Sequence, residues 1–328
     1  HPARKGVGIY GIAHAPQRTT SHENRVFFKG DELKKTPKRL AIIGAGKVGT
    51  AIGHILQKKG FNIVAVASRT QESLDCARDF IFGFKTRDVA EAAKLADVII
   101  LTTNDDQVEP ACRKIAQNGG FDAQDVVFHV SGALSLNVLD SAKAIGAKVG
   151  SIHPLQSFAT VGGAVSQLPG SVFGVTAEKE VLTLARDIVE ALGGTAIVVK
   201  DEDKPLYHAA ACVASNYFVG LIHFAQSIYE SLGVSKEVAL KALLPLIKGT
   251  LANMESQGTA GALTGPIARG DVEPVKRHLE AFGSKIPEKK KLYCELGKHT
   301  TLVALEKGTI SKDKQKELYQ LLQGGGLE

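Results

Sequence analysis

Leu40-Ala-Ile-Ile-Gly44-Ala-Gly46-Lys-Val-Gly49 is the stretch that decides the fold of this 328-residue chain. Its apolar start predicts a buried strand, and the glycines have the G-x-G-x-x-G spacing of a dinucleotide-binding turn. Gly44 permits the tight turn, Gly46 lets a pyrophosphate approach the backbone, and Gly49 allows close packing of a helix on the strand. The phosphates would lie at the helix N-terminus, where free N–H groups and the dipole favour anions. We therefore predict a dinucleotide site that includes Lys47 and Val48.

The second predicted strand, residues 61–67, indicates which dinucleotide binds. It ends in Ser68-Arg69-Thr70, at the distance from the glycines where NAD sites carry Asp or Glu for the ribose 2′-hydroxyl. The first carboxylate here is Glu72. Two hydroxyls and a guanidinium favour a 2′-phosphate instead, so the predicted cofactor is NADP(H). The alternative is an exposed polar turn in which Arg69 is only solvated.

Strands alternate with helices up to about residue 200. The expected strands are residues 40–43, 61–67, 84–86, 97–103, 126–130, 147–152, 171–175 and 195–199. This alternation predicts an α/β fold of the Rossmann type, with a doubly wound, mainly parallel sheet covered by helices on both faces. Ligands of such sheets bind at the C-terminal ends of the strands. We therefore count Thr103, the last residue of its strand, with the cofactor site.

From residue 201 onward the pattern is helical. Helices are expected at residues 205–232, 236–253, 272–282, 291–305 and 312–322. The first is apolar around much of its circumference, which indicates burial against its own domain or a second subunit. We predict an N-terminal extension (1–37), a Rossmann domain (38–200), a helical domain for substrate binding and dimerisation (201–322) and a linker-like tail (323–328). A homodimer through the helical domain is expected.

Composition favours a globular enzyme of about two domains, since 44% of the residues are hydrophobic and 23% are charged. No apolar run approaches the roughly 20 residues that span a bilayer. The net charge of +6 is dispersed along the chain, which indicates a solvated surface rather than a nucleic-acid site. Four separated cysteines favour reduced thiols and a cytoplasmic location over disulfides or zinc. We expect a small anionic substrate, and no metal, membrane or nucleic-acid partner.

Candidate catalytic residues occur where the two predicted domains meet in the sequence. Lys204 and His208 are four residues apart, which places them on one face of the predicted helix. Ser215 follows near the same stripe, and Asn216 lies towards its edge. Because a residue before proline avoids helical conformation, Pro205 favours a cap position for Lys204. Either Lys204 or His208 alone would be interpreted as structural, but together they favour a functional pair.

Three other segments offer groups for substrate binding. Ser131 and Gly132, after the 126–130 strand, either present a hydroxyl and N–H groups to a carboxylate or form an ordinary strand-exit turn. His153 either lines the cleft or packs beneath the turn set by Pro154. Arg269, in a glycine-rich loop, either clamps a substrate carboxylate, caps a helix or pairs with the nearby Asp271.

Taken in order, these motifs resemble a known family. Those that carry the resemblance are Gly44-Ala-Gly46-Lys-Val-Gly49, His129-Val-Ser131-Gly132, Ser151-Ile-His153-Pro154, Lys204…Tyr207-His208…Ser215-Asn216 and Leu263-Thr-Gly-Pro-Ile-Ala-Arg269-Gly-Asp271. The set is similar to the Rossmann-like proteins with a C-terminal helical domain of unknown function. These are relatives of pyrroline-5-carboxylate reductase and the β-hydroxyacid dehydrogenases, and some are the alternative ketopantoate reductases of pantothenate biosynthesis. The resemblance covers about residues 38–322.

The resemblance implies an NADP-dependent oxidoreductase. By similarity to the β-hydroxyacid dehydrogenases, Ser131 and Gly132 would hold the substrate carboxylate and Lys204 would be the general acid or base. Those enzymes carry Asn four residues after the lysine, whereas this chain has His208, so the proton donor stays open between Lys204 and His208. Asn216 would supply the amide only from a different spacing. The expected reaction is NADPH-dependent reduction of 2-dehydropantoate, and the alternatives are cyclic-imine reduction and a non-catalytic NADPH sensor.

Overall fold

The computed structural model describes residues 38–324, so the predicted extension (1–37) and the end of the predicted tail (325–328) lie outside the described residues. The chain divides into two compact units, of which the first ends at Ser215 and the second begins at Asn216. The strands stop at Val198, close to the predicted domain boundary. Helix α8 (Lys204–Cys212) follows the strands but still belongs to the first unit.

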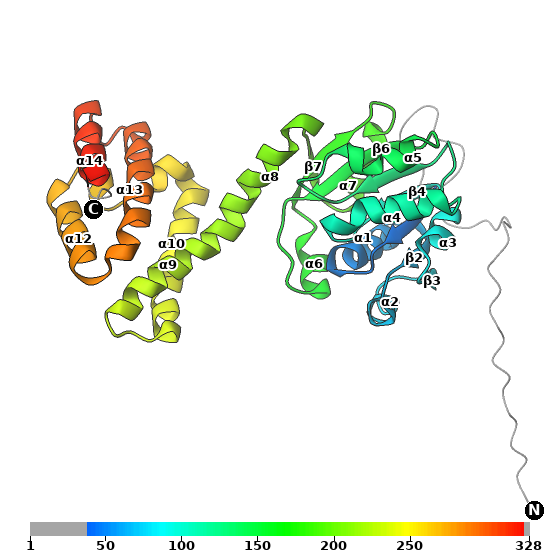
Figure 1. The fold of residues 1–328 in the computed structure, drawn as a ribbon, viewed down its shortest axis with the longest axis horizontal. Helices are drawn as coiled ribbons and strands as arrows, with labels where there is room; N and C mark the ends of the chain where they lie inside the picture. The colour runs from blue at the N-terminus through cyan, green and yellow to red at the C-terminus, as the bar shows by residue number, and fades with distance from the viewer. Residues whose placement is uncertain (1–37, 325–328) are drawn as a thin grey trace, which may run out of the picture. The chain divides into compact units, whose positions relative to one another are not determined.

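The first unit is built on an eight-stranded sheet with the order β3-β2-β1-β4-β5-β6-β7-β8 (Figure 1). Its strands are β1 (Arg39–Ile43), β2 (Asn62–Ala67), β3 (Phe84–Thr86), β4 (Val98–Leu101), β5 (Val126–His129), β6 (Lys148–Pro154), β7 (Val172–Ala177) and β8 (Thr195–Val198). Neighbouring strands are parallel except for β6 and β7. The prediction of a mainly parallel Rossmann-type sheet is therefore confirmed.

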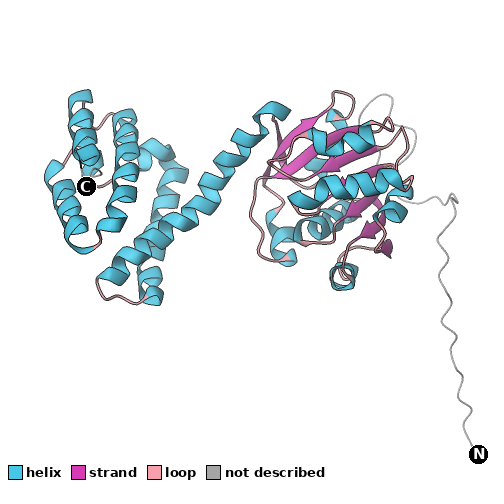
Figure 2. Cartoon of the chain, viewed as in Figure 1, coloured by secondary structure: helices cyan, strands magenta, loops and turns pink. Residues whose placement is uncertain are grey.

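Helices cover the sheet, as Figure 2 shows by colour. They are α1 (Lys47–Lys58), α2 (Gln71–Arg78), α3 (Val89–Lys94), α4 (Asp105–Gln117), α5 (Asp140–Lys143), α6 (Val161–Gln167) and α7 (Leu182–Ala191). Leu40 and Ile42 of β1 belong to one apolar core, and Ala41 and Ile43 belong to another. Because successive side chains of a strand point to opposite faces, the sheet is buried on both sides.

The second unit is helical. It contains α9 (Phe218–Ser231), α10 (Lys236–Ala262), α11 (Pro266–Arg269), α12 (Val272–Lys285), α13 (Pro287–Lys307) and α14 (Lys312–Gly324). Leu279, Cys294 and Leu318 belong to a small core that joins α12, α13 and α14. Among the described residues, no helix is both long enough and apolar enough to cross a membrane.

Two predicted helices differ from the structure. A π-helical segment, Val213–Tyr217, interrupts the helix predicted at 205–232 and separates α8 from α9. The helix predicted at 236–253 continues to Ala262, with Gly258 at a φ of 72°. Glycine adopts this backbone conformation without a Cβ clash, so the helix changes direction there. Asp105 and Asp106, which follow the predicted strand 97–103, open α4, where the helix dipole favours carboxylates.

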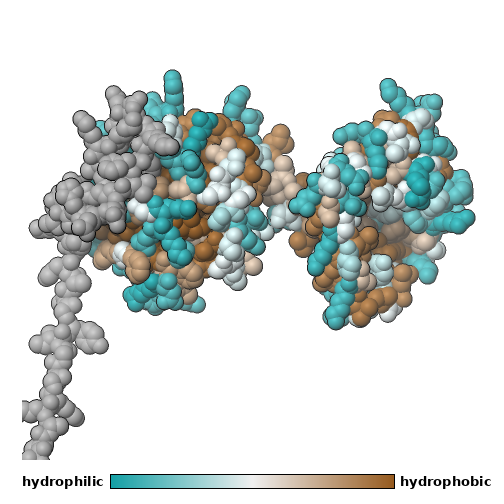
Figure 3. Space-filling view, turned by 180° about the vertical axis from the view of Figure 1, so that it is seen from behind, coloured by the Kyte–Doolittle hydropathy of each residue, from teal (hydrophilic) through white to brown (hydrophobic). Residues whose placement is uncertain are grey.

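Burial of the first C-terminal helix against its own domain, one of the two predicted alternatives, is not found for most of its apolar side chains. Val213, Val219 and Leu221 are exposed, and Gln226 is the one side chain of α9 that is fully buried. Figure 3 shows apolar surface in brown on this unit. The other predicted partner of this helix, a second subunit, stays a prediction.

Candidate active site

The glycine turn joins β1 to α1, as predicted. Gly44 has a φ of 117°, and a Cβ at this position would lie 2.8 Å from the backbone carbon of Thr102, after β4. A Cβ at Gly49 would collide with the Gly44 carbonyl oxygen and Thr102 Oγ1. Gly46 is different, because no heavy atom lies within 4 Å of its hypothetical Cβ. Open space therefore lies at the N-cap of α1, where the free backbone N–H groups of a helix attract anions.

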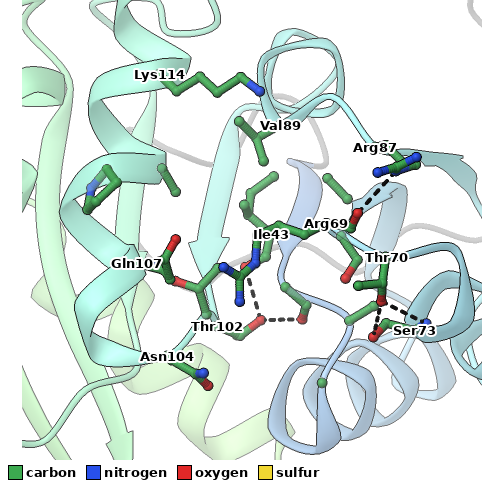
Figure 4. A pocket seen from close by; sticks show the side chains of 18 residues that line it. Ile43, Arg69, Thr70, Ser73, Arg87, Val89, Thr102, Asn104, Gln107 and Lys114 are labelled. Carbon is green, nitrogen blue, oxygen red and sulfur yellow. Dashed lines mark hydrogen bonds between the residues drawn. The ribbon is translucent and has the colours of Figure 1, made fainter.

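A cavity of about 320 Å³ lies beside this turn, at the C-terminal ends of β1, β2 and β4 (Figure 4). Six residues predicted for the cofactor line it: Gly44, Gly46, Ser68, Arg69, Thr70 and Thr103. Lys47, Val48 and Gly49 belong to α1 and do not line the cavity. The turn is held to β4 by Thr102 Oγ1, which donates to the Gly44 carbonyl oxygen at 2.6 Å.

Basic side chains surround the cavity, and none of its lining residues is acidic. Arg69 extends across it in Figure 4, and Arg87 and Lys114 lie on opposite sides. Arg87 Nε donates to the Arg69 carbonyl oxygen at 3.0 Å, which ties the end of β3 to the end of β2. Arg87 and Lys114 were not predicted, because a single basic residue outside a motif gives no positional signal. Three cations without a carboxylate fit a 2′-phosphate better than a ribose 2′-hydroxyl.

Two threonines at the cavity differ in how their hydroxyls are used. Thr70 Oγ1 accepts from the Ser73 N–H and donates to Ser73 Oγ at 2.9 Å, so Thr70 caps α2. Ser73, which was not predicted, thereby joins the lining of the cavity. Thr103 Oγ1 is buried and has no hydrogen-bond partner among the described residues. Since buried hydroxyls are nearly always paired, Thr103 fits a position that a ligand completes.

A second group of polar residues surrounds Lys204 of α8, beside the strands β5 and β6. It is only 2% exposed, and its Nζ donates to the Ser131 carbonyl oxygen at 3.1 Å and to Ser151 Oγ at 2.7 Å. Burial lowers the pKa of Lys204 to about 8, although Asp201 and Asp105 oppose the shift. The amine is therefore mainly protonated at neutral pH, yet close to the pH at which it releases a proton.

The predicted cap position of Lys204 is wrong. Asp203 is the N-cap, and Lys204 is the first residue of α8, with a helical φ of −54°. The 3-10 turn Asp201–Asp203 leads directly into the helix, so the restriction that Pro205 places on Lys204 is overridden.

The antiparallel strand β7 explains how α8 reaches this place. Since β7 runs against β6 and β8 runs with β7, the register places Val198, at the end of β8, level with Val175 of β7 and with Ile152 of β6. Asp201 Oδ1 then accepts from the Leu136 N–H at 2.9 Å. From there α8 follows β6: Lys204 bonds to Ser151, and one turn later Tyr207 bonds to His153.

Ser131 is buried, and its polar groups have partners within the first unit. Its Oγ donates to Asp105 Oδ2 at 2.9 Å and accepts from the N–H groups of residues 133 and 134. Its N–H donates to His129 Nδ1 at 3.1 Å. These bonds fix the turn after β5 so that the Ser131 carbonyl faces Lys204. The predicted contact between the Ser131 hydroxyl and a substrate carboxylate stays a prediction, and it would compete with Asp105.

Three histidines of the first unit belong to this neighbourhood. His129 is fully buried beneath the turn, and burial lowers its pKa to about 3. His153 Nδ1 lies 3.0 Å from the Tyr207 hydroxyl, and its ring centroid lies 6.1 Å from that of His208. Burial lowers the pKa of His153 to about 4, with smaller contributions from Lys204 and His208, so its ring is neutral at pH 7. Lys204 and His208 both lie on α8, and His153 of β6 lies beside His208.

The remaining predicted residues lie at the boundary or in the second unit. Ser215 ends the first unit and Asn216 begins the second, and both are exposed on the π-helical segment. Arg269 Nε donates to Asp271 Oδ2 at 2.8 Å, which is one of the predicted alternatives. Contact of these residues with a substrate stays a prediction.

Comparison with known families finds two matches that together span most of the chain. Residues 24–154 match the Rossmann-like domain, and residues 171–300 match DUF2520, a domain of unknown function. The predicted combination of a Rossmann-like domain with a C-terminal domain of unknown function is therefore confirmed.

Solved structures share this fold. A proposed NADP oxidoreductase from Bacteroides fragilis is 24% identical, with a TM-score of 0.64 over 80% of this chain and 98% of its own. A protein of Thermotoga maritima is 21% identical, with a TM-score of 0.60 over 88% of this chain and 98% of its own. A pyrroline-5-carboxylate reductase from Coxiella burnetii is 18% identical, with a TM-score of 0.51 over the same shares.

Proposed function

We propose that this chain, which carries a Rossmann-like domain and a DUF2520 domain, is an NADPH-dependent reductase of a small 2-oxo acid, with 2-dehydropantoate as the substrate. The observation that carries the proposal is Lys204, a buried lysine of α8 that bonds to Ser131, after β5, and to Ser151 of β6, in the sheet that also carries the glycine turn, with a pKa lowered to about 8 by burial. Such a lysine is suited to proton transfer near neutral pH.

The cavity supports NADP(H) as the cofactor. Gly46 leaves space for a pyrophosphate at the N-cap of α1, and Thr103, whose buried hydroxyl has no partner among the described residues, lines the same cavity. Arg69, Arg87 and Ser68 would hold the 2′-phosphate, because a guanidinium and a hydroxyl are its preferred donors. The name of the Bacteroides fragilis protein points to the same cofactor.

Lys204 is the proton donor in this proposal. NADPH, when bound, supplies the hydride that reduces the substrate carbonyl. The carbonyl oxygen then requires a proton and a cationic neighbour. An ammonium has three N–H bonds, and Lys204 uses two of them on Ser131 and Ser151, which leaves one for the substrate oxygen. His208 is the alternative donor, or a relay to Lys204.

Cyclic-imine reduction is the second candidate, and the fold shared with the Coxiella burnetii enzyme favours it. A protonated imine needs no proton from the enzyme. Imine reduction would then make no use of the lowered pKa of Lys204, which is why we prefer carbonyl reduction. A non-catalytic NADPH sensor would likewise have no use for a buried amine.

The test is oxidation of NADPH, and of NADH in parallel, with 2-dehydropantoate, other 2-oxo acids and cyclic imines. Lys204→Gln keeps hydrogen-bond donors but cannot give up a proton, so turnover should fall by roughly 100-fold or more while the Kd for NADPH stays unchanged. Lys200→Gln, at a side chain that is 76% exposed, is the matched control. Oxidation with imines alone would support the second candidate, and NADPH binding without oxidation across the panel would contradict both reductases.

A further inference from the structure

Tyr207 lies one turn after Lys204 on α8, and its hydroxyl contacts His153 Nδ1 at 3.0 Å. The two rings meet edge to face, with centroids 5.6 Å apart. We propose that Tyr207 is a positioning residue that holds His153 in the Nε2-protonated form, so that His153 donates a hydrogen bond to a carboxylate oxygen of the substrate. The substrate part rests on the proposed function, whereas the role of Tyr207 is a property of the chain itself.

The strand β7 fixes the Tyr207 hydroxyl from the other side. A Cβ at Gly174 would lie 2.5 Å from the phenolic oxygen, so a glycine is required for Tyr207 to reach this position. Burial raises the pKa of Tyr207, so the phenol keeps its proton at neutral pH. Among the described residues, His153 Nδ1 lies within hydrogen-bond distance of this hydroxyl, and it is the acceptor that the phenolic proton needs. The Tyr207 O–H therefore donates to His153 Nδ1.

The direction of this bond decides the tautomer of His153. A ring nitrogen that accepts a hydrogen bond carries no proton, so the proton of the neutral ring is on Nε2. The ring is neutral because burial, and then the charges of Lys204 and His208, lower the pKa of His153. His153 is therefore a neutral donor at pH 7.

The position of the His153 Nε2 donor follows from its contact with Gly132. A Cβ at Gly132 would come within 2.8 Å of His153 Nε2 and 2.7 Å of Cε1, so the edge of the ring rests against the backbone of the turn after β5. The ring is only partly buried, which leaves it accessible to a small molecule. Lys204 contacts the same turn through the Ser131 carbonyl. Two donors therefore lie at one turn, and a 2-oxo acid has two oxygen-bearing groups, a carbonyl for Lys204 and a carboxylate for His153.

The tautomer can be measured without substrate. In long-range proton–nitrogen NMR spectra of histidine-labelled full-length protein near pH 7, we expect His153 to be protonated on Nε2 and not on Nδ1, with its signals assigned from their loss in His153→Asn. Tyr207→Phe removes one oxygen and should give a mixture of tautomers. Tyr229→Phe, on α9, removes the same atom elsewhere and should leave the signals unchanged. The role of Tyr207 would be overturned if wild-type His153 were protonated on Nδ1. It would also be overturned if Tyr207→Phe left the tautomer of His153 unchanged.

Substrate kinetics test the second part. Tyr207→Phe should raise KM for the oxo acid about tenfold, while kcat and the Kd for NADPH change less than about threefold. The amide nitrogen of Gln lies near the position of a histidine Nε2, and that of Asn near Nδ1, so His153→Gln should retain more affinity than His153→Asn. Equal KM values for these two variants, at unchanged thermal stability, would overturn the substrate contact. Because the tautomer is measured without turnover, failure of the proposed function and failure of the Tyr207 role are distinguishable.

Discussion

Gly46 and Gly49 should respond in opposite ways to the same added methyl group. In Gly49→Ala the new Cβ would overlap the Gly44 carbonyl oxygen and Thr102 Oγ1, and would lie 3.0 Å from Thr102 Cβ. In Gly46→Ala it would meet no heavy atom within 4 Å, at a φ of −78° that alanine adopts freely. We therefore expect Gly49→Ala to destabilise the first unit and Gly46→Ala to impair binding of the cofactor.

The magnitudes follow from these contacts. Overpacking against backbone costs about 1–3 kcal/mol, and the better helix propensity of alanine returns at most about 1 kcal/mol. A net loss of roughly 1–2 kcal/mol lowers Tm by about 2–8 °C for a unit of this size. Gly46→Ala should change the free energy of unfolding by less than about 0.5 kcal/mol. Because its Cβ would occupy the space for the pyrophosphate, NADPH affinity should fall at least tenfold, or about 1.4 kcal/mol.

The assay combines thermal unfolding of the cofactor-free protein with titration of NADPH for the wild type and both variants. Each variant is the control of the other, since both add one methyl group to the same turn. Wild-type NADPH affinity in Gly46→Ala would refute a pyrophosphate at the N-cap of α1. A wild-type Tm in Gly49→Ala would refute the close approach of α1 to Thr102.

Three further predictions concern charge. Arg69→Ala should weaken NADPH at least about tenfold and NADH little, because only NADPH carries the 2′-phosphate; equal losses in parallel titrations would argue against this pocket. Reductive turnover should fall as pH rises through about 8, because Lys204 must be protonated to act as an acid, and a pH–rate profile that rises there would exclude this role. Burial raises the pKa of Asp125 to about 6, so its contribution to stability is lost as pH rises from about 4 through 6. In urea unfolding at neutral pH, Asp125→Asn should therefore be more stable than the wild type by roughly 1–2 kcal/mol, and at pH 4 this gain should be absent. The same gain at neutral pH and at pH 4 would contradict a raised pKa of Asp125.

The cofactor end of the site was predictable because its determinants are local. Gly44, Gly46 and Gly49 lie within one turn, and Arg69 follows at a spacing set by one helix and one strand. Arg87 belongs to the same cavity but comes from beyond the next strand, where no spacing rule applies.

The surroundings of Lys204 were less predictable from the sequence, because they depend on the topology of the sheet. The spacing of Lys204 and His208 predicted a common helix face, but the partners of Lys204 lie 73 and 53 residues earlier in the chain. They meet because β7 runs antiparallel, and an apolar strand has the same pattern in either direction. Tyr207 was not assigned a role, because a single tyrosine on a helix usually packs in a core.

The hydrophobic pattern also did not predict where a helix is interrupted. Val213–Tyr217 contains no glycine or proline, and apolar residues precede and follow it, so the periodicity predicted one helix where the structure has a π-helical segment. Such a segment lengthens one turn without requiring glycine or proline, and it therefore leaves little trace in composition.

The order of these parts along the chain bears on how the protein is synthesised. The residues that line the nucleotide cavity all lie between Ile43 and Lys114, whereas Lys204 follows the last strand. Since a ribosome delivers the N-terminal part first, the nascent chain can close the cavity before α8 exists. Docking of Lys204 closes long loops and is therefore a late, entropically costly event. A nascent chain at that stage would gain stability from bound nucleotide while it still lacks Lys204, the proton donor that we propose.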